Sequence, residues 1–88
     1  MRFVASWTAF RPDGELWEET ARGSKGVPGE TLDEAKPAAK AWFLKYRATE
    51  TDKNLRYVLK IFEGEKVVWV HDELKGAPLL LPNETPAA

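Results

Sequence analysis

The sequence predicts a single α+β domain of ββαββ order, in which four mostly antiparallel strands form one sheet and a Pro-kinked helix packs on one face. Two hairpin patterns with glycine-containing turns lie towards the two ends of the chain, and one amphipathic segment with a helix-capping signal separates them. We expect the domain to span residues 1–82 and a disordered tail to span 83–88, because polar, Pro and Ala residues at a terminus seldom pack.

The first hairpin is expected from Arg2 to about Arg22, with its turn at Arg11-Pro12-Asp13-Gly14. Proline at the second turn position and glycine at the fourth are typical of a type I turn closed by a left-handed glycine, as in a three-residue hairpin loop. Strand alternation then predicts a core face. That face carries Phe3, Ala5, Trp7, Ala9, Trp17 and Ala21.

The glycine-rich segment 23–29, GSKGVPG, lies between this hairpin and the helix, where phosphate-binding loops occur. It lacks the spacing of such a loop, and Pro28 removes a backbone donor that an anion would need. We therefore interpret the segment as a flexible connector.

The helix is expected to run from Thr31 to about Ala48, because Thr31 and Glu34 have the spacing of a capping box. Pro37 should kink it, or a main helix should begin near this proline. Helical periodicity places seven apolar residues on one side, Leu32, Ala35, Ala38, Ala39, Trp42, Phe43 and Tyr46. Three basic residues should form a solvated stripe on the opposite side, Lys36, Lys40 and Arg47.

The second hairpin, from Leu55 to Glu73, has the sequence LRYVLKIFEGEKVVWVHDE. A two-residue loop, Gly64-Glu65, predicts a type II′ turn and a register that puts Lys60 opposite Trp69. The expected core face carries Tyr57, Leu59, Ile61, Val68 and Val70. The expected outer face carries Val58, Lys60, Phe62, Val67, Trp69 and His71.

This outer face is the predicted partner-binding site, because two large aromatic residues on an uncovered sheet face are costly to leave in water and Trp is enriched in binding hot spots. Three covers are compatible with the sequence. The apolar run Leu79–Leu81 folds back over the face, a second copy covers it in a homodimer, or a foreign protein does.

Composition limits the possible chemistry. The chain has no cysteine, one histidine and a net charge of −1, so no thiolate site, no histidine cluster and no general field for nucleic acid or membrane is expected. No apolar run approaches membrane-spanning length, and no signal-peptide core follows Met1-Arg2, so we expect a cytoplasmic protein. We expect no catalysis, no metal and no cofactor.

A short part of the chain resembles HicB-type antitoxins. Asp13-Gly14, Trp17 and the run PGETLDEA over residues 28–35 follow the strand–DG–strand–loop–helix pattern of that family, over about a quarter of the chain. That family has a third strand before the helix, where this chain has GSKGVPG, and this chain adds a full hairpin afterwards. We base no function on the resemblance.

The sequence therefore favours a non-catalytic protein-binding module, a small accessory, regulatory or inhibitor protein of bacterial or phage origin. The alternative is an RNA or single-stranded DNA binder, in which Trp69 and Phe62 stack bases and the stripe of Lys36, Lys40 and Arg47 follows the phosphates. A homodimeric domain of other function is the third possibility.

Overall fold

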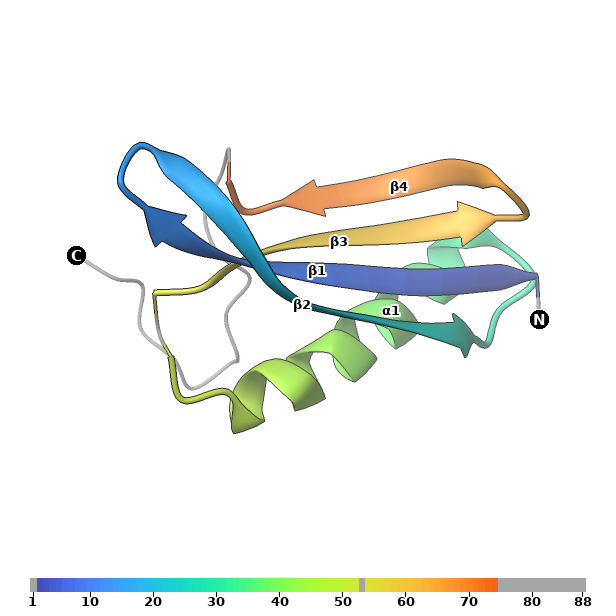
Figure 1. Ribbon diagram of the computed structural model, residues 1–88. Coiled ribbons are helices and arrows are strands. Elements are labelled where there is room, and N and C mark those ends of the chain that lie inside the picture. Colours follow the sequence, from blue (N-terminus) through green and yellow to red (C-terminus); the bar gives the residue numbers. More distant parts are fainter. Residues whose placement is uncertain (1, 53, 75–88) are drawn as a thin grey trace.

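The computed structural model describes residues 2–52 and 54–74, and within them it confirms the α+β, ββαββ arrangement. All four strands are antiparallel and form one sheet of order β2-β1-β3-β4, and the helix lies on one face of it (Figure 1). The predicted tail 83–88 and the run Leu79–Leu81 lie outside the described residues. The elements are β1 (Phe3–Asp13), β2 (Leu16–Val27), α1 (Leu32–Thr49), β3 (Arg56–Glu63) and β4 (Lys66–Asp72).

Both hairpins close with a two-residue Gly-Glu loop. Gly14 and Gly64 have φ values of 63° and 64°, and no non-glycine residue in the described part has positive φ, which is the combination a type II′ turn requires. The prediction for Gly64-Glu65 is confirmed. The three-residue loop predicted for the first hairpin is wrong, because β1 continues through Pro12 to Asp13. Pro12 is tolerated there since β1 has no β3 neighbour beyond Phe10.

A bulge in β4 changes the face on which its side chains lie. Near the turn Phe62 lies opposite Val67 as predicted, but Trp69 lies opposite Ile61 rather than Lys60, so Val68 is the extra residue. Because one inserted residue reverses the alternation, every β4 side chain beyond the bulge changes face. The predicted placement of Trp69 and His71 on the outer face, and of Val70 in the core, is therefore wrong.

The first hairpin contains a second bulge with the same effect. Ala9 lies opposite Ala21, and Phe10 lies opposite Glu19, which leaves Thr20 as the extra residue of β2. Trp17 consequently lies opposite Pro12, on the face away from the helix, and is 41% exposed. Its predicted place in the core is wrong.

β2 extends through most of the segment that the sequence predicts as a connector. Its last five residues, 23–27, pair with the start of β1. Gly23 lies opposite Trp7, and a Cβ atom there would lie 2.9 Å from the indole ring, so the glycine makes room for Trp7. The missing side chains that suggested flexibility instead permit close packing.

The helix begins as predicted and runs without interruption through Pro37. Thr31 caps it by accepting a hydrogen bond from the Glu34 amide at 3.3 Å, and the Glu34 carboxylate accepts from the Thr31 amide at 3.2 Å. The alternative of a main helix starting near Pro37 is wrong. The carbonyl that loses its donor to proline belongs to Asp33, which is exposed, so water can bind it.

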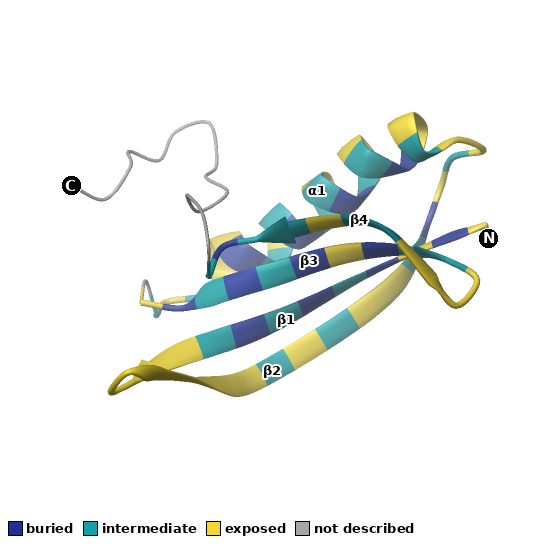
Figure 2. Ribbon diagram, turned by 90° about the horizontal axis from the view of Figure 1, so that it is seen from above, coloured by how far each residue is buried: buried dark blue, intermediate teal, exposed yellow. Residues whose placement is uncertain are grey.

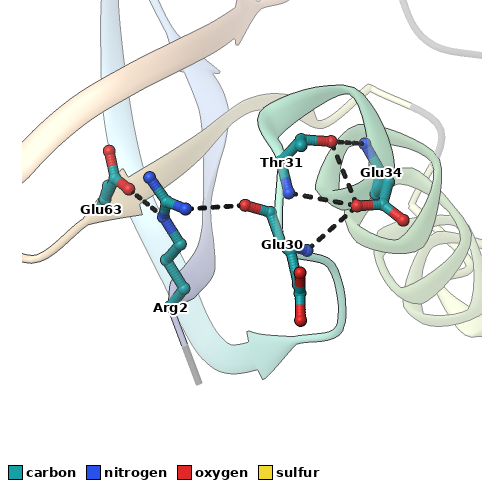
Figure 3. Close-up of polar contacts among 5 residues, drawn as sticks. All are labelled: Arg2, Glu30, Thr31, Glu34 and Glu63. Atoms are coloured by element: carbon teal, nitrogen blue, oxygen red, sulfur yellow. Dashed lines mark hydrogen bonds and ion pairs between the residues drawn. The ribbon is translucent and has the colours of Figure 1, made fainter.

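Arg2 connects the helix start to the central strands (Figure 3). Its guanidinium forms an ion pair with Glu63 at the end of β3 and donates to the Glu30 carbonyl at 2.9 Å. The Glu30 amide in turn donates to Glu34, so one short polar chain joins β3 to the capping box.

The buried side of α1 is turned towards the basic residues. Ala35, Ala39, Phe43 and Arg47 form the buried line, and Arg47 is only 9% exposed. The predicted solvated stripe is therefore wrong for Arg47. The small Ala35 and Ala39 side chains let the helix approach the sheet closely, and Trp42 is left partly buried on its flank.

The core lies between the sheet and α1. Most of the predicted sheet residues are in it, and Leu59 and Ile61 are fully buried. Val70 is the exception among them, at 47% exposed. The buried apolar residues of the described part are Phe3, Ala5, Trp7, Ala9, Val27, Ala35, Ala39, Phe43, Leu55, Tyr57, Leu59 and Ile61.

Candidate functional site

The sheet face turned away from α1 is the candidate site, and we call it the outer face. Its first row crosses three strands, because Val4 lies opposite Phe62 and Phe62 lies opposite Val67. Val4 is 38% exposed and Val67 is 39% exposed, while Phe62 is partly buried between them. Three apolar side chains thus stand side by side in contact with solvent.

The rows behind it are more polar. Lys60 lies between Ser6 and Val70, and Val58 lies next to Thr8 in the following row. Lys60 is exposed and forms no ion pair with residues 2–52 or 54–74. The outer face as we define it consists of Val4, Val58, Lys60, Phe62, Val67 and Val70.

No element of the described part covers this face, because its one helix packs on the opposite side. The edges of the sheet differ in their protection. The β2 edge carries Glu18, Glu19, Arg22 and Lys25, charges that discourage pairing with another strand. β4 carries no charged side chain from 67 to 70, and Val67 and Val70 bring the apolar outer face up to this edge.

The tip of the first hairpin extends the candidate surface. Beyond Phe10 the β1–β2 pair has no β3 neighbour and projects as a two-stranded arm whose residues are mostly exposed (Figure 2). Leu16 is 74% exposed at its end, and Trp17 lies on the outer-face side. The sequence prediction missed this arm, although the shared acid-Gly-Glu pattern of the two turns is its signal.

The predicted partner-binding residues are divided between the two faces of the sheet. Val58, Lys60, Phe62 and Val67 lie together on the outer face, whereas Trp69 and His71 lie on the helix side. The Trp69 ring stacks on His71 with centroids 6.3 Å apart, and the Lys40 ammonium lies 5.5 Å from the Trp69 centroid.

The residues of the nucleic-acid alternative are likewise not brought together. Phe62 and Trp69 lie on opposite faces, so they do not form one stacking platform. Lys36 lies 3.9 Å from Asp33, and Arg47 is buried in the core. The described residues therefore contain no continuous track of the predicted kind.

A buried polar cluster lies where β4 ends. The Glu73 amide donates to the Tyr57 carbonyl at 2.9 Å, and the Glu73 carboxylate accepts from the Tyr57 amide at 3.1 Å. His71 approaches the same carboxylate at 3.6 Å. Glu73 is 3% exposed, so its role in the fold is to fix the end of β4 to the start of β3.

The two tyrosines beside this cluster are held in their neutral form. Burial raises the pKa of Tyr57, and the neighbouring Tyr46, Glu50 and Glu73 raise it further, while Arg47 lowers it. Burial also raises the pKa of Tyr46, which donates a hydrogen bond to Glu50 at 3.3 Å. The sequence prediction missed this cluster, because nothing in a linear pattern shows that Arg47 and Glu73 are buried.

Two further searches gave negative results for residues 2–52 and 54–74. They contain no group of three or more His, Cys, Asp or Glu side chains placed to hold a metal ion. They also contain no helix with the length and apolarity that crossing a membrane demands.

Comparison with known protein families, with curated proteins and with solved structures finds no match for this chain. The resemblance to HicB-type antitoxins therefore remains a local similarity of sequence. In the structure β2 runs through GSKGV, and α1 follows it without a third strand.

Proposed function

We propose that this chain is a non-catalytic protein-binding module whose outer face receives a partner protein. The carrying observation is the apolar row of Val4, Phe62 and Val67, whose end members are 38% and 39% exposed. Contiguous exposed apolar side chains rimmed by polar ones are typical of protein interaction sites. An accessory, regulatory or inhibitory role in the cytoplasm suits a small domain that offers a surface of this kind.

The chemistry of the outer face specifies the partner further. An apolar side chain of the partner would pack over Phe62, between Val4 and Val67. An acidic side chain would lie next to Lys60 in the following row, where the described part of the chain supplies no carboxylate. A partner segment with apolar and acidic residues in alternation would fit both rows.

The open edge of β4 supports the same surface. Within the described residues β4 pairs only with β3, so its other side presents free backbone donors and acceptors. A partner that covers Val67 and Val70 would reach this edge and could add backbone hydrogen bonds to the side-chain contacts. Face and edge together form one continuous interface.

Site-specific photo-crosslinking in the native cells tests the proposal. A benzoylphenylalanine in place of Val67 should give one discrete covalent adduct, and the same residue in place of Ala48, exposed on α1, should give none. The mass of the adduct separates a foreign protein from a second copy of this chain or a nucleic acid. No adduct at Val67, or the same adduct at both positions, would refute the proposed interface.

A further inference from the structure

A cleft of about 220 Å³ lies on the helix side of the sheet, between the end of β2 and the flank of α1. It is separate from the outer face, since β2 and β1 lie between the two. Its walls are formed by Trp42 on the helix and by the strand backbone around Gly26. The residues that line it are Lys25, Gly26, Val27, Pro28, Ala38, Ala41, Trp42 and Lys45.

The cleft follows from small residues at matching positions. Gly26 has no side chain, and Ala38 and Ala41 have only a methyl group, so strand and helix leave space where larger residues would meet. Trp42 is held on this flank because the buried line of α1 runs through Ala39 and Phe43. Its partly buried ring therefore forms a fixed apolar wall.

The charges at the cleft are all of one sign. Lys25 and Lys45 are its two ionisable lining residues, and both are exposed. Neither forms an ion pair with a carboxylate of residues 2–52 or 54–74. Two ammonium groups at one small cleft without a carboxylate repel each other, and an anion between them removes that repulsion.

We propose that this cleft binds a small aromatic carboxylate. The ring would stack on Trp42 over the methyl groups of Ala38 and Ala41, and the carboxylate would lie between Lys25 and Lys45. The cleft is smaller than typical drug-sized pockets, so its volume suits one ring system with a short acidic arm. A carboxylate is favoured over a phosphate because the lining offers neither arginine nor a helix N-terminus.

Titrations followed by NMR test the proposal on the full chain. Phenylacetate should shift the Trp42 indole N–H signal, assigned by its loss in Trp42→Phe, in a saturable manner. Phenylacetamide, which lacks the charge, and acetate, which lacks the ring, should each bind at least tenfold more weakly. A peptide with a C-terminal phenylalanine is the second arm. Tighter binding of the peptide than of phenylacetate assigns the site to chain ends, and the reverse assigns it to free small molecules.

Three variants locate the site. Lys25→Gln and Lys45→Gln should each weaken phenylacetate binding about fivefold, the upper range for a single exposed ion pair. Ala41→Leu should abolish it by filling the cleft, and leucine is compatible with this exposed helical position. Lys60→Gln, which removes a lysine from the outer face, is the matched control and should bind as the wild type does.

Two results would overturn the proposal. One is that neither phenylacetate nor the peptide shifts the Trp42 signal at millimolar concentration. The other is that Ala41→Leu, shown by circular dichroism to be folded, binds phenylacetate with unchanged affinity. Neither result depends on whether the outer face has a partner.

Discussion

Trp69 lies directly opposite Ile61 on the helix side of the sheet, with the Lys40 ammonium 5.5 Å from its ring centroid. We predict that Trp69→Ala destabilises the fold by about 2 kcal/mol, less than for a fully buried Trp, because the ring packs against the core but stays partly exposed. Urea unfolding of the purified chain measures this.

The neighbouring residue supplies the matched control. Val70 points to the outer face and is 47% exposed, so Val70→Ala should change the free energy of unfolding by about 0.5 kcal/mol or less. Equal losses for the two variants would contradict the bulge at Val68 that separates their faces.

Gly23→Ala should destabilise the chain by about 1–3 kcal/mol, because the added methyl group would overlap the Trp7 indole. The ring has little freedom to move away, since it stacks on Tyr46 with centroids 4.1 Å apart. Ser24→Ala, at the exposed next position, should be nearly neutral in the same urea titration. A neutral Gly23→Ala would mean that β2 does not pack against Trp7.

Tyr57 should make the stability fall at high pH. Its pKa is raised in the folded state, so above about pH 10 the unfolded chain loses a phenolic proton that the folded chain keeps. Folding stability contributed by this group is complete below that pH and is lost as pH rises, at up to about 1.4 kcal/mol per pH unit. Urea unfolding at a series of pH values gives the slope.

Tyr57→Phe isolates this contribution from the titration of lysines. The Tyr57 hydroxyl is buried without a hydrogen-bond partner in the described part, so its removal should cost about 1 kcal/mol or less at neutral pH. The variant should lose less stability than the wild type above about pH 10. An identical pH slope for the two proteins would rule out a raised pKa at Tyr57.

Most of the fold could be predicted from local chemistry. The capping box of Thr31 and Glu34 fixes the helix start, and Gly64 fixes the second turn, because each involves residues only a few positions apart. The two bulges could not be predicted this way. An extra residue at Thr20 or Val68 is decided by how distant side chains pack, and no turn signal records it.

The candidate site shows the consequence of that limit. Residues between the second turn and the bulge, such as Phe62 and Val67, lie where alternation predicts. Residues beyond it, such as Trp69, lie on the other face, and Arg47 is buried although it belongs to a basic pattern. Faces of a strand are thus predictable only as far as the first bulge.

One comparison tests the outer face most directly, namely the Val67 photo-adduct measured in Phe62→Ser and in Trp69→Ala. The two aromatic residues lie on opposite faces of the same hairpin, so the account predicts opposite effects. Phe62→Ser should remove the adduct and leave the chain folded, and Trp69→Ala should lower the free energy of unfolding and retain the adduct under conditions where it is folded. An adduct that survives Phe62→Ser but disappears in folded Trp69→Ala would contradict the outer face as the interface.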